Sequence, residues 1–362
     1  MFQFFFRLTI IAVFSFFLSC SEKNENSKKV KPDIKNEVIL YNWKEYTSLD
    51  VLKKFEQETG IKVVLKEFET IEEQIGTLQS NPYFCDLTIV DTHVATSQFY
   101  NTRLIQNLDF TLLENTKHFE SHFKEFTSFS VPYSFGITGY AIDTRKVKKE
   151  YSDYSFLTDP AYKGKLALLD DPYDCFLSLM VATGNDINGQ ITPDILSQLE
   201  STCVKLKENQ ISFNETFTNL DKLVEGEKWI VQTYSGDAAS YQQENDFIKF
   251  FFNSEKYNAW SESICLISNA PNKENAYKLL NFLTRPENAA AFSNEFYYAN
   301  GIIGSEKFVS EIIRSNPLIN ISSDVRSRGI FYLKSKDSNA VMQKIFSMLG
   351  MPSEKDQDEE KN

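Results

Sequence analysis

The segment WSES, residues 260–263, places an aromatic ring and a carboxylate at the start of an apolar run. The letters that follow, ICLIS, predict a buried strand, and a carboxylate at the mouth of such a strand is costly unless a partner neutralises it. No Lys or Arg lies within four positions of Glu262. We therefore expect its partner to be a cation from outside the chain, with the ring of Trp260 as a flat wall beside that charge.

Other patterns that could carry chemistry are weaker. HFESH, residues 118–122, places two histidines four positions apart, a spacing that can hold a metal ion on a helix. The order HExxH is missing and the surrounding residues are charged, so a surface segment is the expected structure. No P-loop, GxGxxG or GxSxG motif opens after a predicted strand. We therefore expect neither an enzyme nor a bound cofactor or metal.

The elements that must position such residues begin with three apolar runs that predict strands, at residues 38–42, 61–68 and 86–90. A helix pattern fills the first gap, with Ser48 as N-cap and Gly60 as the stop. Thr70 and Glu73 form a capping-box pattern that opens a helix in the second gap. This alternation predicts a parallel sheet with helices on its faces. Ligand sites gather where such strands end, and the loops there are rich in aromatic and polar residues: 43–48, 69–73 and 91–96.

A second α/β region follows SVPYSFGITGYAID, residues 130–143. Gly136 and Gly139 interrupt this otherwise strand-like run and indicate a crossover or hinge. A helical stretch from Asp194 to Lys207 and a later helix pattern that Pro286 breaks continue the α/β alternation. The chain has 362 residues, enough for two lobes joined by more than one crossover.

Charge and cysteine content narrow the class of protein. The formal net charge is −12, and nucleic-acid affinity relies on clustered Lys and Arg, so no nucleic-acid partner is expected. Four cysteines lie in the body of the chain without CxxC spacing, so no metal motif is present. Each sits in an apolar stretch, where a small buried hydrophobe is its expected role.

The N-terminus predicts export. Residues 1–19 combine one basic residue with a short apolar run, as in a signal peptide. The end of this run, FLSC, resembles a bacterial lipobox, which implies cleavage before Cys20 and lipidation of its thiol; an ordinary export signal with an incidental cysteine is the alternative. Residues 20–36 are polar and predict a flexible tether, and residues 351–362 predict a disordered charged tail. We expect a protein anchored by lipid to a membrane, in the periplasm or on the outer face of the envelope.

Taken together, the segments of the body resemble the spermidine/putrescine-binding proteins of polyamine ABC importers, from about residue 38 to residue 346. The motifs that carry the resemblance are YNWKEY, KFEQETGIKV, DLTIV, SVPYSFGITG, PAYKGKLALLDD and NKENAYKLLNFLTRPE. The family fold is a two-lobed periplasmic-binding-protein (type II, flytrap) α/β fold, in which each lobe is a mixed sheet flanked by helices. The resemblance implies a first lobe of residues 37–137 plus 263–303 and a second of residues 138–262 plus 304–350.

The resemblance also implies a ligand cleft between the lobes and assigns residues to it one by one. These residues are Trp43, Tyr46, Asp91, His93, Asp171, Asp174, Tyr234, Trp260, Glu262 and Tyr298. A polyamine joins ammonium groups by methylene chains, so carboxylates would accept its charge-assisted hydrogen bonds. The rings would pack on the methylenes and offer cation–π faces. Taken singly, Asp171 also fits a turn, and both tryptophans also fit core packing.

Three positions depart from the family pattern. Lys44 stands where a small hydroxyl residue is common, Asp91 replaces a serine, and His93 replaces a tyrosine. An ammonium group in the cleft would repel a cationic ligand, so we hypothesise that Asp91 pairs with Lys44. With Asp171, Asp174 and Glu262 the cleft would then hold four carboxylates and one ammonium group, a formal charge of −3.

The resemblance implies a protein that captures putrescine or spermidine and delivers it to the permease of an ABC transporter. Two other binding functions stay open. The tandem Tyr297-Tyr298, with Asp91 and His93, could be recruited to bind ferric iron, or the fold could bind another amine. A surface lipoprotein that senses polyamine without transporting it is the second alternative.

Overall fold

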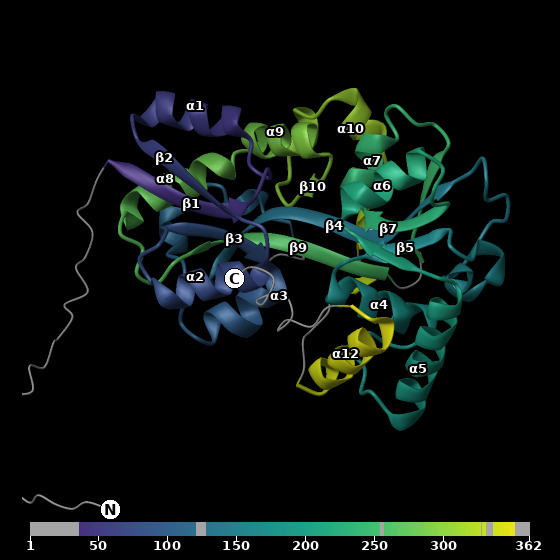
Figure 1. Cartoon of the computed structure of the whole chain (residues 1–362). Coiled ribbons are helices and arrows are strands. Elements are labelled where there is room, and N and C mark those ends of the chain that lie inside the picture. Colours follow the sequence, from purple (N-terminus) through teal and green to yellow (C-terminus); the bar gives the residue numbers. More distant parts are fainter. Residues whose placement is uncertain (1–35, 121–127, 254–256, 327, 331–335, 352–362) are drawn as a thin grey trace, which may run out of the picture. The chain divides into compact units, whose positions relative to one another are not determined.

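The computed structural model describes residues 36–120, 128–253, 257–326, 328–330 and 336–351 (Figure 1). The predicted signal peptide, Cys20, the tether up to residue 35 and the tail from residue 352 lie outside these described residues, as does the second histidine of HFESH. Within the described part of the chain, the structure contains no helix long and apolar enough to cross a membrane. The same residues contain no group of three or more metal-binding side chains.

The first region contains the predicted parallel sheet. Strands β1 (Glu37–Trp43), β2 (Lys62–Phe68) and β3 (Leu87–Asp91) are parallel, with β1 between the other two. The predicted helices are confirmed as α1 (Leu49–Thr59) and α2 (Ile71–Ser80). The sheet continues into β9 (Tyr257–Leu266), which runs antiparallel to β3 and places Asp91 directly opposite Glu262. The strand predicted after WSES is therefore correct and begins before that segment.

Helix ends show why the local sequence folds this way. Thr70 accepts a hydrogen bond from the backbone N–H of Glu73, and the Glu73 carboxylate accepts one from the N–H of Glu69, which stabilises the start of α2. Gly60 ends α1 in the left-handed conformation, with φ of 68°. Ser48 precedes α1 as predicted, but its side chain makes no capping hydrogen bond.

Strand β4 (Ser130–Asp143) is the long crossover predicted from SVPYSFGITGYAID. Its first half pairs with β9 and with β10 (Ala299–Asn300), and its second half pairs with β7 (Ile230–Tyr234) and β8 (Ile248–Phe251). The strands run in the order β2-β1-β3-β9-β4-β7-β5-β6, where β5 is Leu166–Leu169 and β6 is Ser212–Asn214. A separate short strand, β11 (Gly329–Ile330), pairs with β9.

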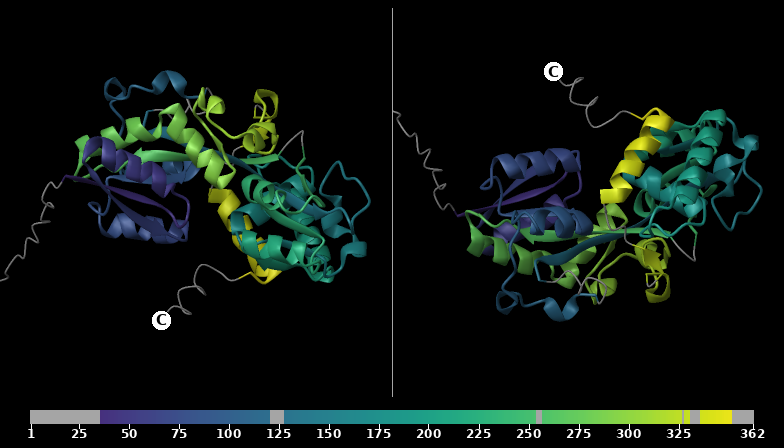
Figure 2. Two further views of the ribbon diagram at one scale, coloured as in Figure 1. Left: turned by 90° about the horizontal axis from the view of Figure 1, so that it is seen from above. Right: turned by 90° about the horizontal axis from the view of Figure 1, so that it is seen from below.

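The remaining helices cover the strands. They are α3 (Thr92–Val94), α4 (Pro172–Ala182), α5 (Pro193–Glu208), α6 (Thr216–Val224), α7 (Ser235–Tyr241), α8 (Lys273–Leu283), α9 (Pro286–Phe296), α10 (Glu311–Ser315), α11 (Ser323–Arg326) and α12 (Lys336–Leu349). Large apolar cores form separately on β1–β3 with α1 and α8, and on β5 with α4, α5 and α12. The turned views show α12 packed beside α5 (Figure 2).

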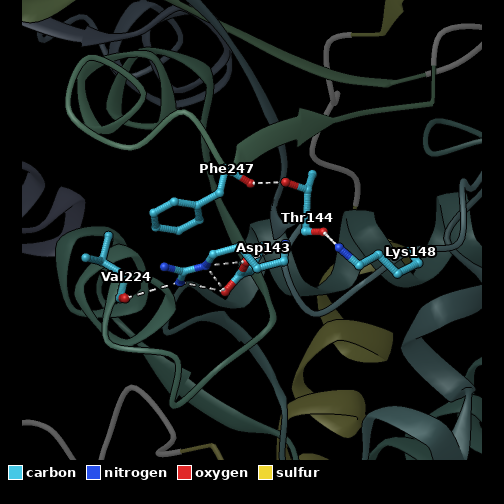
Figure 3. A network of polar contacts seen from close by, with 6 residues as sticks. Asp143, Thr144, Lys148, Val224 and Phe247 are labelled. Carbon is cyan, nitrogen blue, oxygen red and sulfur yellow. Dashed lines mark hydrogen bonds and ion pairs between the residues drawn. The ribbon is translucent and has the colours of Figure 1, made fainter.

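A network of polar contacts lies at the C-terminal end of β4, around Asp143 (Figure 3). The Arg145 guanidinium donates to both carboxylate oxygens of Asp143, and it lies 3.3 Å from the centre of the Phe247 ring. Asp143 is fully buried and Arg145 is half-exposed, so the ion pair keeps a buried carboxylate neutralised. This network belongs to the scaffold.

Cys85, Cys175, Cys203 and Cys265 are buried and unpaired, as predicted for small hydrophobes.

Candidate functional site

The loop after β1 is held in place by its own polar groups. Asn42 donates to the carbonyl oxygen of Tyr46 at 2.8 Å and to the hydroxyl of Thr47 at 2.7 Å. Tyr133 on β4 donates to the same Tyr46 carbonyl at 2.8 Å. The chain can turn here because Glu45 adopts the left-handed conformation, with φ of 55°. These contacts fix the backbone of Tyr46, and its hydroxyl reaches Ser134 on β4.

Alternation along β9 places Asn258, Trp260 and Glu262 on one face of the sheet. Ser134, Gly136 and Thr138 alternate in the same way on the neighbouring strand β4. Gly136 lies opposite Trp260, and a Cβ atom added to it would stand 2.1 Å from the indole ring. The indole of Trp260 therefore packs directly on the backbone of Gly136. The hinge predicted at this glycine stays a prediction.

Glu262 is buried, with 7% of its surface exposed. The Ser134 hydroxyl donates to its carboxylate at 3.0 Å, and the Tyr46 hydroxyl donates to Ser134 at 3.3 Å. Burial raises the pKa of Glu262 to about 8, and the charge of Asp91 on β3 adds to the rise. The Ser134 hydroxyl and the nearby Trp43 indole act in the opposite direction on this pKa. The indole N–H groups of Trp43 and Trp260 are buried and have no hydrogen-bond partner among the described residues.

Asp171 and Asp174 lie at the start of α4. Asp171 is the N-cap, and its carboxylate accepts the backbone N–H of Asp174 at 2.9 Å, so the turn-like role weighed from the sequence is real. Burial raises the pKa of Asp171 to about 6. Burial, followed by the charge of Asp171, raises the pKa of Asp174 to about 7.

The carboxylate of Asp174 is surrounded by neutral donors. Thr138 and Asn258 each donate to one of its oxygens at 2.8 Å, and the Tyr234 hydroxyl donates to the other at 2.9 Å. These donors come from β4, β9 and β7, so three strands converge on one carboxylate. The strand face that holds Glu262 therefore also holds Asp174, with Trp260 between them.

Four rings form a continuous row. Tyr234 lies 5.9 Å from Trp260, Trp260 lies 5.2 Å from Tyr298, and Tyr298 lies 5.8 Å from Tyr46, measured between ring centres. We call these four rings with Glu262 and Asp174 the aromatic–acid cluster. Its neighbouring rings lie edge to face against one another, and Tyr234 also donates to Asp174. A cavity of about 370 Å³ lies elsewhere, among residues 293–326 and Glu120, and none of the predicted site residues lines it.

Two parts of the prediction need correction or fall outside the described structure. The hypothesis of a Lys44–Asp91 pair is wrong, because Lys44 Nζ lies 2.6 Å from Glu69 Oε1 and both side chains are more than half exposed. The Lys44 backbone N–H bonds to Phe68 at the end of β2, which directs this residue towards the neighbouring loop. The predicted site therefore keeps its four carboxylates but loses the ammonium group of Lys44. The formal charge of −3 predicted for the cleft is wrong. His93 lies in α3, and its side chain is outside the described part.

Trp43 and Asp91 lie beside the cluster. The ring of Trp43 packs 4.5 Å from that of Phe68, between the centres, and so also fills the core edge. Asp91 ends β3 and accepts the backbone N–H of Val94 at 3.1 Å. Tyr297, the partner of Tyr298 in the iron alternative, is the left-handed cap of α9, with φ of 61°.

Asp237, which is 9% exposed, was not predicted from the sequence. The Tyr298 hydroxyl donates to one of its oxygens at 2.7 Å and the Thr216 hydroxyl to the other at 2.9 Å. Burial raises the pKa of Asp237 to about 6. Ser134, Thr138 and Asn258 were also missed. Their even spacing from Gly136 and from Trp260 is the signal that could have found them.

Comparison with known proteins identifies the family. The family described as bacterial extracellular solute-binding protein matches residues 50–312, well over half of the chain. The chain belongs to this family. The spermidine/putrescine-binding periplasmic protein 1 of Haemophilus influenzae is 25% identical over 316 residues, which cover 85% of this chain and 87% of that protein. The putrescine-binding periplasmic protein PotF of Escherichia coli is 26% identical over 322 residues, with 82% and 86% covered.

Solved structures of solute-binding proteins share the fold. The spermidine/putrescine substrate-binding protein PotD of Streptococcus pneumoniae superposes with a TM-score of 0.78 at 20% identity, over 87% of this chain and 98% of that chain. A putative spermidine/putrescine transporter protein of Listeria monocytogenes gives a TM-score of 0.78 at 22% identity, over 88% and 99%. The two-lobed α/β fold of periplasmic binding proteins predicted from the sequence is thereby confirmed.

Proposed function

We propose that this solute-binding protein captures a polyamine, putrescine or spermidine, and delivers it to the permease of an ABC importer. The observation that carries the proposal is the order of groups along one strand face: Glu262, the Trp260 ring and Asp174. Carboxylates bind ammonium groups, and an aromatic face packs on methylenes and attracts cationic charge. The family and the curated relatives, whose names specify spermidine and putrescine, support the same ligand class.

The spacing favours an elongated ligand. On β4, Ser134 donates to Glu262 and Thr138, four residues further on, donates to Asp174. On β9, Glu262 itself is four residues from Asn258, which donates to Asp174. At a rise of about 3.3 Å per residue, four residues span roughly 13 Å. One small cation cannot contact both ends of such a span, whereas a chain with ammonium groups separated by methylenes can.

Capture would take place between two lobes. We infer a boundary within β4 and β9, with residues 37–137 plus 263–303 in one lobe and residues 138–262 plus 304–350 in the other. The rings of the aromatic–acid cluster touch one another, so a ligand enters only when the rings from the two lobes separate. Closing around the ligand then excludes water and strengthens each ionic contact.

Isothermal titration calorimetry of residues 21–362 with putrescine, spermidine and spermine tests the ligand class. We expect saturable binding of at least one of these amines by the folded protein. Folded protein that gives no heat with any of them would contradict the proposal. A ferric site would instead produce a visible charge-transfer band, which a polyamine site lacks.

We also propose that Cys20 carries a lipid that anchors the protein to a membrane, in the periplasm or on the outer face of the cell envelope. The lipobox-like FLSC supports this anchor. A Cys20→Ser variant is expected to leave the membrane fraction and to lose incorporation of labelled palmitate. A Cys85→Ser variant is the control, because Cys85 is buried in the body of the protein.

A further inference from the structure

The two carboxyl groups at the ends of the aromatic–acid cluster accept hydrogen bonds from neutral groups, within the part of the chain that the structure describes. Glu262 is bonded to the Ser134 hydroxyl, and Asp174 to two hydroxyls and one amide. Among the described residues, none of these hydrogen-bond partners carries a positive charge. A buried charge without such a partner is strongly disfavoured.

The charged group that acts on Glu262 from the described residues is acidic. Asp91 faces it directly from β3, and Asp91 is the group whose charge acts on it. Tyr46 from the loop after β1 and Tyr133 from β4 are the other titratable neighbours, and burial raises the pKa of each phenol well above its usual value. The remaining neighbour is α3, which carries His93, whose side chain lies outside the described part.

The titratable groups around Asp174 are likewise carboxyl groups and a phenol. Its own helix supplies Asp171, β7 supplies Tyr234, and β3 supplies the charge of Asp91. The charges of Glu72 on α2 and of Asp170 add to the rise in the pKa of Asp171. The charges of described residues named here as acting on this pair are therefore all negative.

We propose that this cluster exchanges protons for ammonium groups: without ligand Glu262 and Asp174 hold protons, and binding of an amine releases them to the solvent. The inference rests on the proposed function, because it concerns the same site. A bound ammonium group supplies the positive charge that each carboxyl lacks. The carboxyl group then ionises, its proton leaves to the buffer, and the amine keeps its own proton, since alkyl ammonium groups have a pKa near 10.

The direction of the pH dependence follows from this exchange. Ligand binding lowers the pKa of each carboxyl, so affinity rises with pH through the values of the free protein. These values are about 7 for Asp174 and about 8 for Glu262. Linkage predicts about a tenfold gain in affinity per pH unit for each proton released, levelling off above pH 8. At pH 7 the release is about one to two protons per ligand.

Calorimetry with putrescine at pH 7 measures the protons directly. The same titration is run in phosphate and in MOPS, whose ionisation heats differ, and the affinity is measured at pH 6, 7 and 8. We expect a buffer-dependent heat and an affinity at least tenfold weaker at pH 6 than at pH 8. Binding with equal heat in both buffers and equal affinity at pH 6 and pH 8 would overturn proton exchange while leaving polyamine binding intact. Loss of binding at every pH would overturn the proposed function itself.

Variants assign the protons to residues. Glu262→Gln is expected to release about one proton fewer on binding putrescine. Its affinity should therefore rise with pH about tenfold less per pH unit than the affinity of the wild type. Glu274→Gln is the matched control, because Glu274 is exposed on α8 and paired with Lys278. We expect the control to release as many protons as the wild type. If a variant binds too weakly for calorimetry, infrared spectroscopy of the wild type supplies the test. The band of a neutral carboxyl group in the free wild type should disappear on adding putrescine, and an unchanged spectrum would contradict the proposal.

Discussion

Gly136 shows how one missing side chain shapes the candidate site. The Trp260 ring occupies the space where a Cβ atom of residue 136 would stand. Gly136→Val is therefore expected to displace the ring and to weaken polyamine binding at least tenfold, about 1.4 kcal/mol, because the aromatic face leaves the line between the two carboxyl groups. Calorimetry measures the affinity, and circular dichroism verifies the fold.

Gly76→Ala is the control for that substitution. Gly76 lies in α2, has no atom near its Cβ position, and has an ordinary helical conformation. Alanine favours helix, so this variant should be at least as stable as the wild type and should bind polyamine equally well. If Gly136→Val bound as tightly as Gly76→Ala, the ring of Trp260 would have no part in binding.

Glu262 offers the second test at the residue scale. Glu262→Gln keeps the size of the side chain and removes the charge that would pair with an ammonium group. We expect binding to weaken by roughly 2–5 kcal/mol, the usual cost of truncating one partner of a buried ion pair. The free protein should melt at the same or a higher temperature at pH 8, because the variant buries no ionisable group there. Unchanged affinity would remove Glu262 from the site.

At the scale of elements, the sequence predicted most of the first region and the crossover. Apolar runs and helical spacing located β1, α1, β2, α2 and β3, because each is set by local residues such as Gly60 and Thr70. The partners of side chains from distant elements could not be predicted. Lys44 pairs with Glu69 and Asp237 accepts from Tyr298, and each pair depends on how separate elements meet. Local sequence carries no record of such long-range contacts.

The capping box of α2 gives a prediction at this scale. Thr70→Ala removes the hydroxyl that accepts from the N–H of Glu73, and should lower the free energy of unfolding by about 1 kcal/mol. Ser48→Ala is the comparison at the start of α1, where the side chain makes no capping bond. Urea denaturation followed by circular dichroism measures both. Equal losses for the two variants would show that the capping bond does not stabilise α2.

At the scale of the whole molecule, β4 and β9 connect the two regions and bring their acids together. Glu262 lies opposite the end of β3, whereas Asp174 and Asp237 come from α4 and α7, which cover the second region. Each of these carboxyl groups is buried, so ionisation costs free energy in the folded protein. The acids that suit a cationic ligand therefore destabilise the fold when no cation is present.

This cost predicts how stability depends on pH. The pKa is raised to about 6 for Asp171 and Asp237, about 7 for Asp174 and about 8 for Glu262, so between pH 5 and 8 the folded chain holds more protons than the unfolded chain. The free energy of unfolding should then fall as pH rises through this range, by up to about 1.4 kcal/mol per pH unit for each group still protonated. Urea denaturation at pH 5, 6, 7 and 8 measures the slope, and saturating putrescine should flatten it because ammonium groups replace the protons. Stability that rises from pH 5 to pH 8 without ligand would show that these carboxyl groups are ionised in the folded protein.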